Sequence, residues 1–226
     1  MKLFLYEMGA IGGHAIAEAL TLQCDIPVQR FHRLSESQNG DYYKQVKDSS
    51  EQYCIISSFR DPIQKNIDQF FIDLWFLNNT GKATDQITED EAKELFLKLA
   101  PHTGSYRWYE EWMKPAFDID VYQIPLMRPG YQFVKNDRLI FINIAFELEA
   151  QTKTTVLKHF LKLDFLELPN ACSKIDVPDR ADLCSSLSNG GWLPKDYVSN
   201  ITNSEYFRKF YSHLSTEQYI SYWAET

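Results

Sequence analysis

The stretch MGAIGGHAIAEAL, Met8 to Leu20, follows directly on KLFLYE, an apolar run that ends in a glutamate. Gly9, Gly12 and Gly13 lie between the strand that this run predicts and the helix that follows it. In such a turn, backbone N–H groups usually hold a phosphate. This turn offers no Lys, Ser or Thr side chain to help hold one. The stretch therefore predicts a strand, a turn and a helix, but leaves open what the turn binds.

The order of the next apolar segments predicts an α/β fold. Further strands are expected at Pro27 to His32 and at Gln52 to Phe59. Pro62 fits the first turn of a helix, because its missing N–H costs nothing there. Thr88 and Glu91 have the spacing of a capping box and predict another helix. Units of strand, turn and helix build a parallel sheet flanked by helices, which is the fold class we expect.

The second half of the chain predicts a hairpin, a helix and a helical end. In YQFVKNDRLIFINI, Asn136 and Asp137 are expected to form the turn between two strands, and LEAQTKTTVLKHFLKL predicts a helix. Residues 167–194 are rich in Asp, Ser, Asn, Gly and Pro and are expected to be loop-like, whereas residues 203–224 are expected to be helical. We expect a single domain over residues 1–226.

Composition excludes several classes of protein. The 226 residues carry a net charge of −8, which argues against a nucleic-acid binder because such a protein needs a basic face. Neither a membrane span nor a secretory signal is visible, so a cytoplasmic protein is expected. The four cysteines show no CxxC spacing, so we expect reduced thiols and no metal site.

Two common phosphate-binding motifs do not fit the glycine turn. A Walker A loop requires a lysine and a hydroxyl residue after its second glycine, and both are missing. A dinucleotide-binding turn requires the spacing G-x-G-x-x-G, whereas the spacing here is G-x-x-G-G. Neither motif therefore explains the turn.

A better match appears when the turn is considered together with SSFRDPIQKNIDQFF. A glycine loop after the first strand, followed by Arg-Asp-Pro at the end of a later strand, resembles the sulfotransferase superfamily. More narrowly, the chain looks like the bacterial family of capsular polysaccharide synthesis proteins. The segments that carry this resemblance are YEMGAIGGHAI (Tyr6 to Ile16), FHRL (Phe31 to Leu34), FRDPIQKNIDQFF (Phe59 to Phe71), RLIFINIAFELEA (Arg138 to Ala150) and SEYFRKFYSHLSTEQYISYW (Ser204 to Trp223).

The resemblance implies a three-layer fold like that of P-loop nucleotide-binding proteins, with 3′-phosphoadenosine 5′-phosphosulfate as sulfate donor. In the family, a loop lysine and the serines after it hold the 5′-phosphosulfate, while an arginine and a later serine hold the 3′-phosphate. Here Ala10 stands in place of the lysine, and Gly13 to Ala15 stand in place of the loop serines. Arg60 is retained, but Asp68 occupies the position of the later serine.

These replacements are expected to weaken donor binding. Losing a charge-assisted bond to the donor phosphate costs roughly 1.5 to 3 kcal/mol. A carboxylate about 5 Å from a phosphate charge adds about 3 kcal/mol of repulsion before screening. The donor site is therefore expected in altered form at Gly9, Gly12, Gly13, Arg60 and Asp68. An alternative role for Arg60 is to cap the strand end or to pair with a neighbouring aspartate.

Two histidines are the candidate catalytic residues. His32 lies at the carboxyl end of the second predicted strand, where ligands bind in open α/β sheets, and it is the first candidate for a general base. His14 lies at the start of the first predicted helix, where the helix dipole favours a neutral imidazole. An alternative for His14 is a surface position without a role.

An aromatic cluster offers a place for an acceptor. Tyr106, Trp108 and Trp112 are candidate substrate-binding residues, although aromatics at this spacing are more often part of the core. Together with the resemblance, they suggest a sulfotransferase-like enzyme that acts on a small molecule or a saccharide, with an altered donor site. It would use an unusual donor or catalyse a different reaction, and a plain sulfotransferase with the usual donor and substituted contacts stays open as a variant. The alternative is a non-catalytic binding or scaffold protein on the same fold.

Overall fold

The computed structural model of the chain describes most of its length, as residues 2–9, 12–32, 51–72, 86–100, 102–128, 130–169 and 178–225. Ala10, which stands where the family's loop lysine would be, lies outside the described residues. The chain divides into two compact units, each made from two stretches. Unit 1 contains residues 1–60 and 108–173, and unit 2 contains residues 61–107 and 174–226. Whether these two units together form the single domain that the sequence predicts is not tested by this division, so the single domain stays a prediction.

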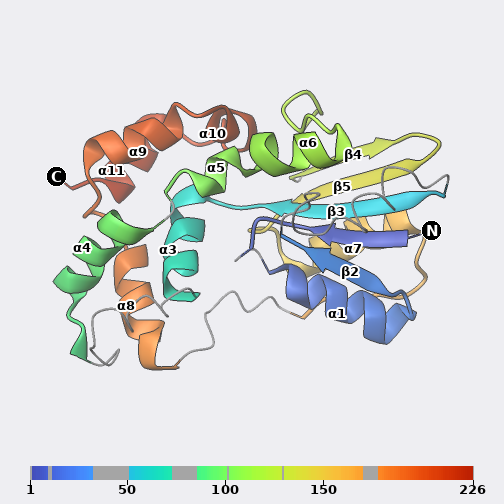
Figure 1. Ribbon diagram of the computed structural model, residues 1–226, viewed down its shortest axis with the longest axis horizontal. Coiled ribbons are helices and arrows are strands. Elements are labelled where there is room, and N and C mark those ends of the chain that lie inside the picture. Colours follow the sequence, from blue (N-terminus) through green and yellow to red (C-terminus); the bar gives the residue numbers. More distant parts are fainter. Residues whose placement is uncertain are drawn as a thin grey trace. The chain divides into compact units, whose positions relative to one another are not determined.

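Unit 1 is built on a five-stranded sheet with the strand order β2-β1-β3-β5-β4 (Figure 1). The strands β1, β2, β3 and β5 run parallel to one another, whereas β4 runs antiparallel to β5 at the edge of the sheet. In chain order they are β1 (Lys2–Tyr6), β2 (Val28–Phe31), β3 (Tyr53–Phe59), β4 (Tyr131–Lys135) and β5 (Leu139–Ala145). The predicted parallel sheet is thus confirmed, with an antiparallel edge strand.

One face of this sheet carries the main apolar core of unit 1. The helices α1 (Gly13–Cys24) and α7 (Ala150–Leu161) supply the residues that pack on this face. Every second residue of β1, β3 and β5 points into the same core, as alternation along a strand requires. The core contains Leu3, Leu5, Ile16, Ala17, Leu20, Cys54, Ile56, Ile140, Ile142, Val156, Leu157 and Leu161.

The other face of the sheet is covered by a helical segment that includes η3 (Tyr109–Met113) and α6 (Lys114–Phe117). The Tyr6 ring packs against Trp108 and Phe117 at centroid distances of 4.9 and 5.0 Å. The Tyr109 hydroxyl lies 2.8 Å from Asn143 Oδ1 in β5, so a buried polar pair fixes this segment to the sheet. Helices therefore cover both faces, and Figure 1 shows α1 and α6 on opposite sides of the sheet.

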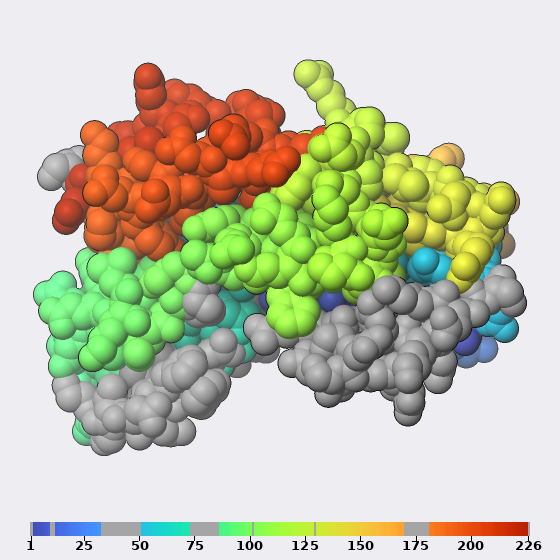
Figure 2. Space-filling view, turned by 45° about the horizontal axis from the view of Figure 1, so that its top comes forward, coloured from blue at the N-terminus to red at the C-terminus, as the bar shows by residue number. Residues whose placement is uncertain are grey.

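The edge hairpin is held by side chains that bond to neighbouring backbone. Asn136 Oδ1 accepts hydrogen bonds from the N–H groups of Arg138 and Leu139, which closes the predicted turn. The buried Gln132 amide in β4 donates to the carbonyl groups of Val121 and Ile124. Figure 2 shows the yellow hairpin beside the yellow-green segment that precedes it. The Asn136–Asp137 turn predicted from the sequence is confirmed.

Unit 2 is helical in its described residues. Its helices are α3 (Pro62–Ile72), α4 (Glu89–Leu99), α5 (Gly104–Trp108, whose last residue belongs to unit 1), α8 (Pro178–Ser188), α9 (Lys195–Thr202), α10 (Glu205–Phe210) and α11 (Thr216–Trp223). The capping box at Thr88 and Glu91 is present, as predicted. The helical end of the chain and the helix that begins at Pro62 are also confirmed.

The expectation that residues 167–194 are loop-like is wrong in part, because α8 lies within them. The sequence of this helix, PDRADLCSSLS, is dominated by small and polar residues that usually indicate loops. Its apolar residues are few and are interspersed with polar ones, so the pattern that reveals an amphipathic helix is weak. The helix is instead stabilised by tertiary packing against α3 and α4, which the local sequence does not reveal.

A partly buried chain of hydrogen bonds in unit 2 contains a histidine that is held in its neutral form. The Asn66 amide lies 3.1 Å from the Tyr197 hydroxyl, which lies 3.1 Å from Nδ1 of His102. Nε2 of His102 is 3.1 Å from the Leu97 carbonyl, and since a carbonyl only accepts, Nε2 carries the proton. Nδ1 therefore accepts from Tyr197, and burial lowers the pKa of His102 below its usual value.

This arrangement predicts a loss of stability in acid. The unfolded chain takes up a proton at position 102 near the ordinary histidine pKa of about 6.5, whereas the folded chain resists it. The free energy of unfolding should therefore fall as the pH is lowered from about 8 to below the unfolded pKa. The His102→Gln variant should show a weaker fall over the same range in urea titrations. If both proteins respond equally to pH, His102 is not held neutral by this network.

Candidate functional site

The candidate site lies in unit 1, where the parallel strands β1, β2 and β3 end at the same edge of the sheet. Glu7 follows β1, His32 follows β2 and Arg60 follows β3. The Glu7 N–H donates to the Phe31 carbonyl at 3.1 Å, which keeps the first two strand ends together. The glycine turn begins just after Glu7 and leads into α1. This is the edge at which open α/β sheets bind ligands.

The Glu7 carboxylate is the central group of the site. Its side chain is 2% exposed, and its Oε1 atom lies 3.2 Å from Nη2 of Arg30. Its Oε2 atom is buried and has no hydrogen-bond partner of ordinary geometry among the described residues. That oxygen lies against Gly13, and a Cβ atom at position 13 would overlap it. Position 13 is therefore a glycine because a carboxylate occupies the space of its side chain.

Gly13 is also the first residue of α1, so the carboxylate lies at the amino end of a helix. Gly12, the N-cap residue, has a left-handed backbone and supplies no side-chain cap. The amino end of a helix favours negative charge, because its first N–H groups lack partners within the helix. Glu7 thus places the chain's own anion at the end of α1 where the glycine turn would present a phosphate.

Burial and neighbouring charges shift the pKa of the Glu7 carboxyl group in opposite directions. Burial raises the pKa of the Glu7 carboxyl group above its usual value, and this is the larger effect. The Arg30 guanidinium, the nearby His32 ring and the Gly13 amide each act to lower the same pKa. A carboxyl group with a raised pKa at a strand end is a common feature of functional sites.

His32 is held in one tautomer by the backbone. Its Nδ1 atom lies 3.1 Å from the Glu7 carbonyl oxygen, and because that oxygen only accepts, Nδ1 carries the proton. Nε2 then has a lone pair that is available to accept a proton. The indole N–H of Trp108 donates to the His32 carbonyl at 3.0 Å and fixes the backbone at this position. The geometry therefore suits the predicted role of His32 as a general base.

His14 is placed differently. Its side chain is 75% exposed, and its Nδ1 atom lies 3.2 Å from Nη1 of Arg30. Because a guanidinium only donates, Nδ1 accepts this bond, and Nε2 lies 3.8 Å from Glu18. Arg30 thus joins His14 to Glu7, and the Nδ1 lone pair is already engaged. The catalytic role of His14 stays a prediction.

Gly12 faces the other side of the turn. It has φ 74°, and a Cβ atom there would lie 2.7 Å from the Phe146 ring. The guanidinium carbon of Arg60 lies 4.2 Å from the centroid of the same ring, and Arg60 is 5% exposed. Gly9 also has a positive φ, of 76°. The two glycines at the start of α1 therefore both allow close packing, one against a carboxylate and one against a ring.

The remaining predicted site residues have other surroundings. Asp68 lies in unit 2 and is buried, with Oδ1 accepting from the Gln64 amide at 2.9 Å and facing Cys184 Sγ at 3.6 Å. Tyr106 also belongs to unit 2. Trp108 and Trp112 belong to unit 1, where Trp108 is 5% exposed and supports His32. Substrate binding by these aromatics stays a prediction.

Sequence reasoning did not assign Glu7 and Arg30 to the site. Glu7 was visible as an acidic residue directly after a buried strand, which is an unusual place for a charge. Arg30 lies within the second predicted strand, on whose exposed side a charged residue is ordinary. Only the parallel pairing of β1 with β2 brings the two side chains together.

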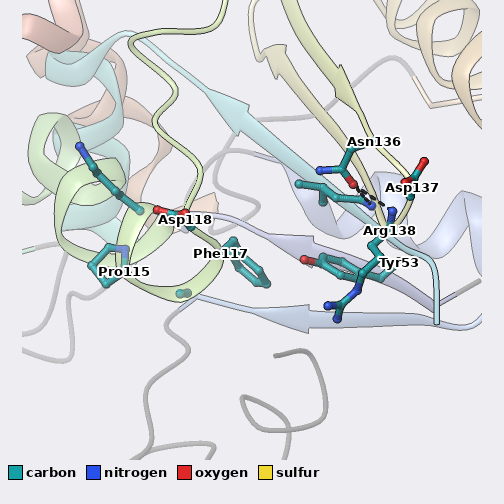
Figure 3. Close-up of a pocket in the computed structure, with 10 residues that line it drawn as sticks. Tyr53, Pro115, Phe117, Asp118, Asn136, Asp137 and Arg138 are labelled. Carbon is teal, nitrogen blue, oxygen red and sulfur yellow. Dashed lines mark hydrogen bonds between the residues drawn. The ribbon is translucent and has the colours of Figure 1, made fainter. Parts of the chain in front are cut away.

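A larger hollow lies at the opposite edge of the sheet. It has a volume of about 860 Å³ and is lined by residues at the starts of β3 and β5 together with α6. Figure 3 shows Tyr53, Phe117 and Arg138 around it, with the Asn136 turn beside them. Ligands of open α/β sheets bind at the carboxyl ends of the strands. Because this hollow lies at the amino ends, we do not assign the candidate site to it.

Comparison with known proteins leaves the chain without an assigned relative. No family model matches the sequence, and searches of curated proteins and of solved structures find no significant match. Within the described ranges, every helix is too short or too polar to cross a lipid bilayer. The same ranges contain no group of three or more His, Cys, Asp or Glu side chains placed to hold a metal ion. A cytoplasmic location stays a prediction.

The packing of Glu7 against Gly13 predicts strong energetic coupling between the two positions. Gly13→Ala should lower the free energy of unfolding by about 1–3 kcal/mol, because the new methyl group overlaps the carboxylate. In a Glu7→Ala background, the same substitution should cost little or even stabilise α1, since alanine favours helices over glycine. Urea denaturation of the four proteins measures the coupling.

Gly12→Ala is the matched control for this cycle. It should also destabilise the protein, because of its positive φ and its contact with Phe146, but the cost should be the same with and without Glu7. An equal cost of Gly13→Ala in both backgrounds would show that the carboxylate does not occupy this position.

Proposed function

We propose that the protein is a transferase with a sulfotransferase-like fold, which moves a sulfuryl or related small electrophilic group onto a hydroxyl group of a small molecule or saccharide. The observation that carries the proposal is the His32 ring, whose Nδ1–H is bound by the Glu7 carbonyl so that Nε2 is left as a base. This ring lies at the carboxyl edge of a parallel sheet, beside a glycine turn.

The reaction uses His32 as general base. The acceptor hydroxyl gives its proton to Nε2, its oxygen forms a bond to the electrophilic atom of the donor, and the leaving group departs with the electron pair of the broken bond. His32 becomes positively charged in this step. In its ionised form the Glu7 carboxylate favours that charge on His32, and the Arg30 guanidinium favours the ionised form by lowering the pKa of Glu7 against the effect of burial.

The donor is proposed to differ from 3′-phosphoadenosine 5′-phosphosulfate. The Glu7 carboxylate lies at the end of α1, next to Gly13, and repels a second anion there. In the family that the chain resembles, a loop lysine stands where this chain has Ala10, so no lysine side chain is available at that position to offset the repulsion. A donor that presents less negative charge to the turn fits these residues better.

Titration calorimetry with 3′-phosphoadenosine 5′-phosphate tests the altered donor site. The wild-type protein should show little or no binding at sub-millimolar ligand concentrations. The double variant Ala10→Lys/Asp68→Ser should bind measurably, and adding Glu7→Gln should strengthen binding about tenfold by removing the competing charge. Adding Glu18→Gln instead, an exposed carboxylate on α1, should change the affinity little. Micromolar binding by the wild-type protein would contradict the altered donor site and favour 3′-phosphoadenosine 5′-phosphosulfate as the donor.

A non-catalytic binding protein on the same fold is the second candidate. It is favoured by the small space beside Gly12, where the cavity has a volume of only about 20 Å³. This cavity, as the described residues line it, is too small for a nucleotide donor. In this alternative the glycine turn is a packing feature, and the site holds a small ligand without turnover.

The two candidates differ in what His32 does. A thermal-shift screen with nucleotides, acetyl-CoA, S-adenosylmethionine and sugar phosphates should first identify a ligand. For the enzyme, His32→Gln should then reduce turnover with that ligand by about 10²- to 10⁴-fold while its binding changes little. His213→Gln, at an exposed position in unit 2, should leave both unchanged. Ligand binding with no turnover by the wild-type protein would favour the second candidate.

A further inference from the structure

A buried lysine lies at the carboxyl edge of the sheet, outside the groups used above. Lys153 is in the first turn of α7 and is only 6% exposed. Its ammonium nitrogen lies 4.8 Å from the centroid of the Phe146 ring. Among the residues that the structure describes, this ammonium group forms neither an ion pair nor a hydrogen bond, and its contact is with the ring. Lysine is rarely this buried unless something pairs with it.

The charges around Lys153 do not neutralise it. The Arg60 guanidinium lies over the same ring, 4.2 Å from its centroid, and repels the ammonium group. Burial lowers the pKa of Lys153, and Arg60 lowers it further. Glu147 is the carboxylate that acts in the other direction, but its side chain is exposed and forms no ion pair with Lys153. Two cationic side chains thus share one aromatic ring.

Lys153 lines a small enclosed space. The cavity has a volume of about 20 Å³ and is bounded by Gly12, Ser58, Phe146, Lys153 and Pro169, among others. A space of this size holds one water molecule or one atom of a ligand, and no more. Its walls are apolar apart from the lysine, Ser58 and the backbone of Gly12, so a neutral water would find few partners there.

We propose that this cavity receives one oxygen of a terminal oxyanion, and that Lys153 is the residue that binds it. The ligand is a small molecule ending in a sulfate, phosphate or carboxylate group, with one oxygen in the cavity and the remainder outside it. The Phe146 ring forms one wall and keeps the two cations in place. The amino ends of α1 and α7 both lie beside the cavity and favour the same sign of charge.

The site is distinct from the position that Glu7 occupies. Glu7 packs against Gly13, whereas Phe146 and the cavity lie against Gly12. An anion on the Gly12 side therefore meets the cation of Lys153, whereas one on the Gly13 side meets the Glu7 carboxylate. The inference does not depend on the proposed group transfer, because a binding protein without catalytic activity would carry the same site.

Anion binding by the full chain tests the proposal. Thermal unfolding and calorimetry would be measured with sodium sulfate, phosphate or acetate, with ionic strength held constant by chloride. At least one of the three oxyanions should bind saturably and raise the melting temperature beyond the effect of chloride. Binding of sulfate and phosphate alone would indicate that the ligand ends in a tetrahedral oxyanion. Binding of acetate as well would show that the site also accepts a carboxylate group.

Lys153→Met keeps the apolar stem and removes the charge. It should weaken the binding of that oxyanion at least about tenfold, as expected for a lost charge-assisted bond. Lys158→Met, on the same helix, is the control and should bind the oxyanion like the wild type. Lys153→Met should also unfold at the same or a higher temperature without oxyanions, since it removes a charge that burial of the side chain disfavours. Absence of saturable binding in the wild type, or equal binding by Lys153→Met, would overturn the proposal.

Discussion

The contact between the Glu7 carboxylate and Gly13 is the constraint on which the rest of the site depends. A carboxylate 2% exposed at the end of a strand needs compensation, and it receives this from Arg30 on the next strand and from the amino end of α1. Arg30 reaches it because β2 is parallel to β1 and ends at the same edge. The Glu7 carbonyl in turn orients His32, so the backbone and the side chain of one residue organise both neighbouring strand ends.

This contact gives a different explanation for the glycines of the turn. Glycines between a strand and a helix usually indicate backbone N–H groups that approach a phosphate. Here the closest anion at Gly13 belongs to the chain itself, and Gly12 is held against the Phe146 ring. The glycines are therefore explained by what packs on them, and the cationic side chains of Arg60 and Lys153 lie beside the Phe146 ring instead.

Much of the fold could be predicted from the sequence, because hydrophobic periodicity and turn chemistry are local. The strands of unit 1, the turn at Asn136 and the helix that begins at Pro62 all follow from short segments. The helix α8 could not be predicted, since its polar sequence depends on packing against other helices. The site was predicted only in part. His32 follows from its place at a strand end, whereas the burial of Glu7 and Lys153 depends on neighbours that are distant in the sequence.

The close contacts of Gly12 and Gly13 also constrain how this chain can diverge. Each glycine is linked to one distant partner, Gly13 to Glu7 and Gly12 to Phe146. A relative that carries a larger residue at either position can keep the same backbone only if the partner becomes smaller. Positions 7 and 13, and separately positions 12 and 146, should therefore vary together in evolution, so that the arrangement of this edge would be recorded as two covarying pairs.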